Sequence, residues 1–178
     1  MSDIQDFYNG YEDAKMGGGV PAGQYEFEIT ENLGTPEWFE SVNGRQCVEC
    51  TTSVVGGPYD GEYGPRIRFQ TGGFTYNVKD KSGEQVYDDR GQPKTRTVED
   101  ETILERLKGQ VRTIHGANPP QITNAERMCD QIADACVGDH FIANLVEKGT
   151  FTNFGKMWAL SDPPEGFVSA SRAADFTT

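Results

Sequence analysis

The first half of the chain contains three short stretches in which apolar and polar side chains alternate, at residues 23–31, 45–55 and 66–70. A two-residue period is typical of strands that bury one face, so all three are predicted to be strands. In the first stretch the inward residues are Tyr25, Phe27 and Ile29, and the outward residues are Glu26, Glu28 and Thr30. In the last stretch Ile67 and Phe69 face inward, and Arg66, Arg68 and Gln70 face outward.

The middle stretch is rich in Val, Thr and Cys, which fit a pleated, half-buried surface. Alternation places Val48, Cys50, Thr52 and Val54 on one face, and Cys47, Glu49, Thr51 and Ser53 on the other. Residues 56–65 are rich in Gly and Pro, which break any regular element and predict a loop. An apolar face backed by a face that carries arginines is how a small sheet would present a surface to a polyanion.

A period of 3.6 residues replaces this alternation in the second half of the chain. One apolar stripe predicts a helix near residues 99–114 that ends before Gly116, and it consists of Ile103, Leu104, Leu107, Val111 and Ile114. A second stripe predicts another helix, and it consists of Ala125, Met128, Cys129, Ile132, Ala133 and Cys136. Thr123 and Glu126 have the spacing of a capping box at its start, and Gly138 is a natural C-cap.

Two further strands are predicted at residues 139–148 and 150–160, the last one bulged at Gly155. The resulting fold class is mainly β with two helices (α+β): an OB-fold-like five-stranded barrel with a helical insert before the last two strands. Between the third strand and the first helix lies a polar excursion, residues 72–97, with a hairpin turn expected at Asp89-Arg90-Gly91. The expected organisation is a flexible N-terminal segment (1–22), the barrel domain (23–160) and a C-terminal tail (161–178).

Composition agrees with one small domain of short strands and long loops, because the 178 residues include 21 Gly and 9 Pro and are only 35% hydrophobic. An apolar run of about 18 residues would be needed for a membrane span, and the chain has none. The acidic start of the chain does not have the pattern of a signal peptide. We therefore expect a cytoplasmic protein.

The net charge of −12 argues against attraction of the whole body to nucleic acid. Its distribution is uneven, however. Residues 1–64 carry a net charge of −10, whereas residues 65–115 carry ten Lys or Arg against eight Asp or Glu, a net charge of +2. The basic residues are thus concentrated in less than a third of the chain, either as a dedicated groove or as a mixed-charge segment.

A surface for a polyanion such as a nucleic acid requires cations for the phosphates, and exposed rings offer stacking platforms for bases. The candidate cations are Arg66, Arg68, Lys79, Lys81, Arg90, Lys94 and Arg96, and the candidate rings are Tyr59, Tyr63, Phe74, Tyr76, Phe151 and Phe154. Tyr59 and Tyr63 are favoured because they sit in a Gly/Pro loop where burial is hard to arrange. The alternative is that the cations are solvated and paired with Asp80, Asp88 and Asp89, and that the rings are core residues.

Three phrases of the sequence support this interpretation: VPAGQYEFEI at residues 20–29, GGPYDGEYG at 56–64, and GDHFIANLVEKGTFTNFGKMWAL at 138–160. In this order they resemble bacteriophage single-stranded-DNA-binding proteins of the OB-fold type. The resemblance implies a non-catalytic role in phage DNA replication or recombination, with single-stranded DNA as ligand, replication or recombination proteins as further partners and a homodimer left open. Many such proteins end in an acidic tail with a terminal Phe, whereas here Phe176 is followed by two Thr.

No cofactor, metal or catalytic constellation is expected. Cys47 and Cys50 with Cys129 and Cys136 make a zinc site conceivable. Residues three apart on a strand face opposite sides, however, and the other two cysteines fit the helix stripe as core residues. His115 and His140 are the only histidines, and no phosphate loop, HExxH or Ser/His/Asp order stands out, so an enzyme is not expected.

The sequence therefore predicts a protein that binds single-stranded DNA with little base preference. Two rivals remain at this point. One is an acidic protein-binding module, such as a DNA-mimic inhibitor of a host enzyme, suggested by the charge of −10 on the first third. The other is a structural virion component that uses the same small barrel.

Overall fold

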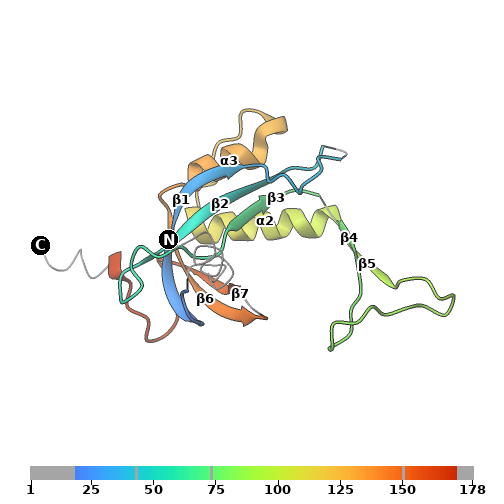
Figure 1. Cartoon of the computed structure of the whole chain (residues 1–178). Helices are drawn as coiled ribbons and strands as arrows, with labels where there is room; N and C mark the ends of the chain where they lie inside the picture. Colours follow the sequence, from blue (N-terminus) through green and yellow to red (C-terminus); the bar gives the residue numbers. More distant parts are fainter. Residues whose placement is uncertain (1–18, 43, 73, 150, 172–178) are drawn as a thin grey trace, which may run out of the picture.

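The structure is a computed structural model that describes residues 19–171 except 43, 73 and 150, so most of the predicted N-terminal segment lies outside the described residues. Five antiparallel strands form one strongly curled sheet (Figure 1). Its order is β3 (Ile67–Gln70), β2 (Cys47–Val55), β1 (Gly23–Gly34), β6 (His140–Lys148) and β7 (Phe151–Ala159). The predicted α+β, OB-fold-like architecture with a helical insert before the last two strands is thereby confirmed, and its five strands form a half-barrel.

The helices cover the open side of this half-barrel. α2 (Asp100–His115) contacts both edge strands, β3 and β7, and α3 (Met128–Cys136) packs on β1, β2 and β3. Of the predicted stripes, Leu104 and Ala125 are exposed and Met128 is only partly buried. The remaining residues form the buried faces: Ile103, Leu107, Val111 and Ile114 on α2, and Cys129, Ile132, Ala133 and Cys136 on α3. They meet the inward residues of the sheet, including the fully buried Phe27, Ile29, Phe69 and Phe141. Burial of each such large side chain contributes roughly 1.5–3 kcal/mol.

The start of the second helical segment differs from the prediction. A short 3-10 turn, η1 (Ala125–Arg127), precedes α3, and Asn124 rather than Thr123 accepts the Glu126 N–H, at 2.9 Å. The Thr123 hydroxyl instead accepts a hydrogen bond from the Gln131 side chain, at 2.7 Å. The predicted capping box is therefore wrong: the capping residue is Asn124, two residues before Glu126, and Thr123 is bound by Gln131, eight residues later.

The bulge predicted at Gly155 is present in β7. Leu145 pairs with Phe154 but Ala143 pairs with Met157, so β7 carries one extra residue opposite β6. A Cβ at Gly155 would lie 3.2 Å from the Val146 side chain, tighter than most packing contacts. The small residue therefore lets the two strands stay paired where the register shifts.

Two glutamates predicted to face solvent are buried, which corrects that part of the alternation. Glu26 is 1% exposed and Glu49 is 3% exposed. Both do point to the outer face of the sheet, as predicted, but that face is covered at these points. Over β1 the cover is the C-terminal segment, residues 162–171, in which the hydroxyl groups of Ser169 and Ser171 donate to the Glu26 carboxylate.

The polar excursion forms a hairpin arm, residues 74–98, that stands off the body (Figure 1). Its base is a two-stranded sheet of its own, β4 (Phe74–Asn77) paired with β5 (Thr95–Val98). Beyond the base the chain makes two turns of the same kind, at residues 80–84 and 88–92. The second confirms the turn predicted at Asp89-Arg90-Gly91, and in it the Gly91 N–H donates to the Asp88 carbonyl at 3.0 Å.

Within the described residues, no helix combines the length and the apolar character that crossing a bilayer requires.

Candidate nucleic-acid interface

Arg66 and Arg68 share one buried carboxylate on the outer face of β2 and β3. Arg66 donates to Glu49 Oε2 at 3.2 Å, and Arg68 Nε donates to Glu49 Oε1 at 2.8 Å. The two arginine side chains remain 62% and 54% exposed, whereas the glutamate side chain is 4% exposed. Because two cations meet one anion, the cluster keeps a formal charge of +1. Glu49 thus fixes both guanidinium groups while part of each stays open to a ligand.

An exposed tryptophan that the sequence analysis did not select lies beside this cluster. The Arg68 guanidinium carbon is 4.6 Å from the centroid of the Trp38 ring, a cation–π contact. The Trp38 ring meets Phe39 edge-on and remains 57% exposed. A Trp-Phe pair in an otherwise polar loop was the only signal in the sequence, and it does not show onto which strand the loop folds.

The two loop tyrosines have different environments. Tyr63 is 65% exposed, and its backbone forms a bridge to Ser53, which places its side chain on the same outer face. Tyr59 instead packs on the core, with its ring edge-on to Tyr25 at 6.0 Å. The loop folds back on β2 through a hydrogen bond from the Gly61 N–H to the Val54 carbonyl, at 2.8 Å. Tyr59 is therefore partly buried, and its role as a stacking ring stays a prediction.

Phe154 also packs as a core residue. Its partner across the strands, Leu145, is 2% exposed, so both side chains point inward. Its ring lies 5.0 Å from Phe27 and 5.5 Å from Phe141, edge-on in both cases. The ring is therefore partly buried against the core.

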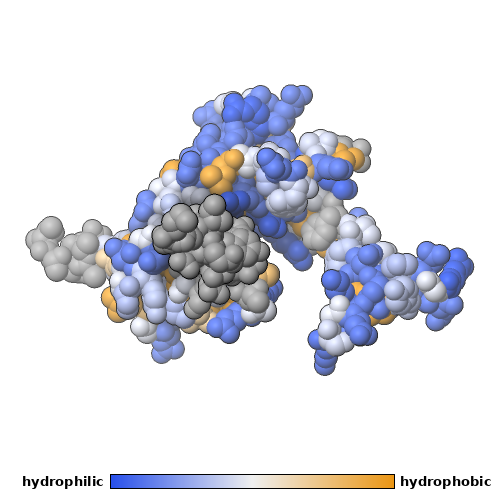
Figure 2. Space-filling view, in the orientation of Figure 1, coloured by the Kyte–Doolittle hydropathy of each residue, from blue (hydrophilic) through white to orange (hydrophobic). Residues whose placement is uncertain are grey.

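The five predicted cations of the hairpin arm are all exposed: Lys79, Lys81, Arg90, Lys94 and Arg96. None of the ion pairs formed within the described part of the chain involves any of them. With four acids on the same segment, the arm carries a net charge of +1. Figure 2 shows the arm as a mostly hydrophilic projection, separated from the body by an open notch.

The acids proposed as partners of these cations have another role. Asp80 Oδ1 accepts the backbone N–H groups of Ser82 and Glu84 at 2.9 and 3.0 Å. Asp88 does the same one turn later, for Arg90 and Gln92 at 2.9 Å each. The hydrogen bond from the Ser82 hydroxyl, followed by the backbone bonds, lowers the pKa of Asp80. These two carboxylates shape the turns rather than neutralise the lysines.

Two tyrosines on the arm add exposed rings. Tyr76, a predicted site residue, is 43% exposed and lies opposite Arg96 in the β4–β5 ladder. Tyr87 is 61% exposed and bridges to Pro93; the sequence analysis missed it because it lies in a stretch without a clear period. Apart from the rings that pack on the core, the predicted residues described here thus fall into two groups, one on the β2–β3 face and one on the arm, joined by the three residues between Gln70 and Phe74.

The four cysteines are buried and free, and they do not meet as a set of four ligands. Burial is the main cause that raises the pKa of Cys50, Cys129 and Cys136 to about 12. As long as no metal ion binds them, thiols of this kind stay protonated and act as small core residues rather than as nucleophiles.

Comparisons of the chain with protein-family models, with curated proteins and with solved structures find no match. The geometry of the two surfaces therefore has to support any assignment of function.

Proposed function

We propose that this chain is a non-catalytic protein that binds single-stranded DNA with little base preference, through the outer face of β2 and β3 and through the hairpin arm. The observation that carries the proposal is the cluster in which Arg66 and Arg68 are held by Glu49 beside the exposed Trp38 ring. Fixed cations next to an open ring are what a strand of phosphates and unstacked bases requires.

The position of the cluster within the fold supports this function. In five-stranded OB-folds the second and third strands form the face that binds oligonucleotides, flanked by loops. β2 and β3 occupy those positions in the chain, and Tyr63 from the loop between them extends the same face. We keep phage DNA replication or recombination in the host cytoplasm as the cellular setting on the basis of the sequence resemblance.

The overall charge of −12 is compatible with local binding. The Debye length at physiological ionic strength is about 8 Å, so exposed acids on distant surfaces are largely screened from a strand on the β2–β3 face. Their repulsion grows at low salt and opposes loose, non-specific contacts elsewhere on the body. A ligand is therefore held by the few contacts that the two surfaces provide.

The test is a fluorescence-anisotropy titration of a labelled oligo-dT strand at several salt concentrations, with a mixed-sequence strand alongside. We expect similar affinities for both, and log K should fall with log salt by about 0.7 for each neutralised phosphate. Arg68→Gln should weaken binding. A matched control is Lys156→Gln, which removes a cation stacked on another tryptophan, Trp158, at 5.2 Å.

Two results would overturn the proposal: no oligonucleotide binding by the folded protein, or equal losses for Arg68→Gln and Lys156→Gln. Capture of a host protein without binding of the oligonucleotide would instead favour the DNA-mimic function.

A further inference from the structure

We propose that His115, Cys136 and Asp139 form a binding site for a zinc ion. Their donor atoms, an imidazole nitrogen, a thiol sulfur and a carboxylate oxygen, all lie within 4.8 Å of one another. His115 Nδ1 and Asp139 Oδ2 are 2.6 Å apart, a direct hydrogen bond that a bound ion would replace as the two atoms separate to the roughly 3.3 Å of tetrahedral ligands. Sulfur, imidazole nitrogen and carboxylate oxygen are the ligands that zinc takes in proteins, usually in a tetrahedron.

Three elements bring the donors together. His115 is the last residue of α2, Cys136 is the last residue of α3, and Asp139 directly precedes β6. The short link is fixed, because the Asp139 N–H donates to the Cys136 carbonyl at 3.0 Å and the Gly138 N–H donates to the Ile29 carbonyl at 2.8 Å. A metal ion would therefore tie both helices to the first residues of β6.

The backbone adds an independent argument for a cation at this point. The C-terminal end of a helix carries a partial negative charge from its unpaired carbonyl groups. The 16 residues of α2 and the 9 residues of α3 both end at the site, together with the Asp139 carboxylate. Two helix ends and a carboxylate form a local field that favours a positive ion.

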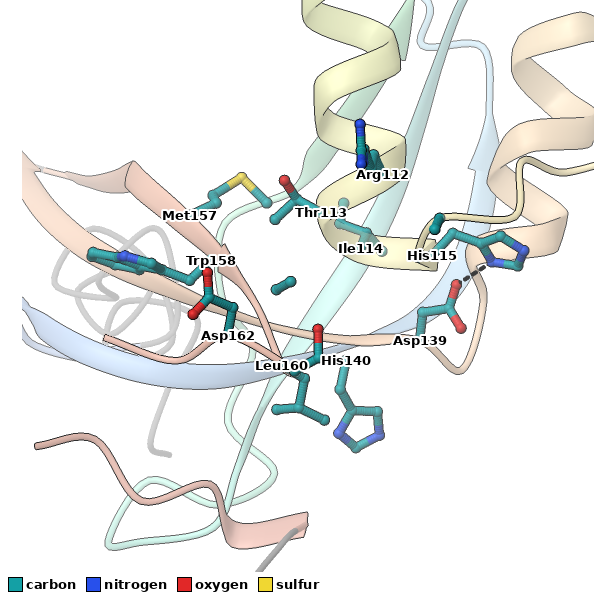
Figure 3. A pocket seen from close by; sticks show the side chains of 14 residues that line it. Arg112, Thr113, Ile114, His115, Asp139, His140, Met157, Trp158, Leu160 and Asp162 are labelled. Atoms are coloured by element: carbon teal, nitrogen blue, oxygen red, sulfur yellow. Dashed lines mark hydrogen bonds and ion pairs between the residues drawn. The ribbon is translucent and has the colours of Figure 1, made fainter. Parts of the chain in front are cut away.

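The site adjoins a cavity of about 660 Å³, which His115 and Asp139 line at one end (Figure 3). Three protein ligands leave one tetrahedral position, which a water molecule or an anion from this cavity can fill. The neighbouring histidine, His140, is not part of the set, because it faces Glu26 on the other side of the strand at 3.2 Å. It therefore provides a matched control.

The inference differs from the four-cysteine arrangement considered from the sequence. That arrangement required two residues of one strand to share an ion, whereas this one uses a single cysteine with donors from two other elements. The ligand pattern, His followed after 20 residues by Cys-x-x-Asp, was too sparse to be recognised before the two helix ends were placed together.

Protein freed of metal with a chelator should gain thermal stability on addition of zinc. At a zinc concentration about 100 times the Kd, we expect Tm to rise by about 5–10 °C. His115→Gln and Cys136→Ala should each lower the zinc affinity by at least about 100-fold in calorimetric titrations. His140→Gln and Cys129→Ala should bind zinc as the unaltered chain does.

Cobalt provides a spectroscopic readout, because a cobalt–thiolate bond gives a charge-transfer band in the near ultraviolet. The band should appear in the unaltered chain and disappear in Cys136→Ala. If Cys136→Ala does not fold, the zinc affinity of His115→Gln provides the test. The His115 side chain is 27% exposed, so its replacement leaves no large void. Absence of a zinc-dependent Tm shift, absence of the band, or equal zinc loss in the His140→Gln control would overturn the inference.

Discussion

Glu49 and Glu26 lie on neighbouring strands, and both are buried on the outer face of the sheet, but their surroundings differ. Glu49 is bound by two arginines whose side chains remain more than half exposed. Glu26 accepts hydrogen bonds from the hydroxyl groups of Ser169 and Ser171, the latter at 2.7 Å. His140 Nδ1 lies 3.2 Å from the same carboxylate.

The difference lies in the partners. Arginine is long enough to reach a carboxylate buried on the outer face of the sheet while part of its guanidinium group stays in water. Serine is short, so its hydroxyl reaches Glu26 only because the whole C-terminal segment lies on the strand. One buried carboxylate therefore creates an open cationic surface, and the other fastens a piece of chain over the sheet.

The largest effect is expected when the arginines are removed but the carboxylate stays. Arg66→Gln with Arg68→Gln leaves Glu49 buried without a counterion, which should reduce the free energy of unfolding by about 2–3 kcal/mol in urea denaturation. Adding Glu49→Gln should restore most of this stability without restoring oligo-dT binding. Recovery of binding in the triple variant would show that the arginines are not the ligand's contacts.

The corresponding change at Glu26 should affect stability alone. Ser169→Ala with Ser171→Ala removes two hydrogen-bond donors from a buried carboxylate, and we expect a loss of about 2 kcal/mol in urea denaturation. Oligo-dT affinity should stay within twofold of the unaltered chain, because the segment covers β1 rather than β3. A matched loss of affinity would mean that the two regions are not independent.

Trp38, the ring that stacks on Arg68, can be tested next. Trp38→Ala should weaken oligo-dT binding by about 1–3 kcal/mol, the value of one stacked base, with little change in the salt dependence. Trp38→Phe should retain part of the affinity, because a ring face remains. If the alanine variant binds as tightly as the original, Trp38 serves only to pack on Arg68.

The smallest effect should come from a single cation on the hairpin arm. Lys94→Gln should reduce the slope of log K against log salt by about 0.7, the value for one phosphate contact on a single strand. The affinity should change by only a few-fold, and stability should not change. An unaltered slope for each of the five arm cations in turn would confine DNA binding to the β2–β3 face.

The inner half of the fold was predictable because its signals are local. The alternation within β1 alone shows that Phe27 and Ile29 face inward, without knowledge of the rest of the chain. What covers the outer face was not predictable, since Glu26 meets serines that follow it by 143 and 145 residues. An alternating glutamate therefore shows which face it takes, but not whether that face is open.

The candidate site shows the same limit at shorter range. Tyr59 and Tyr63 are four residues apart in one Gly/Pro loop, and only the way the loop folds back on β2 separates a packed ring from an exposed one. The cations of the arm could be found from charge alone. Trp38 could not be assigned to the site, because its role depends on where its loop lies over Arg68.

The separate sheet of the hairpin arm makes its reach adjustable. Adding two residues to each of β4 and β5 would carry the tip about 7 Å farther from the body and keep every side chain on its present face. The register of the five-stranded sheet would not change, because β4 and β5 belong to another sheet. Chains with shortened and lengthened arms can therefore act as rulers for the number of nucleotides that one molecule occupies.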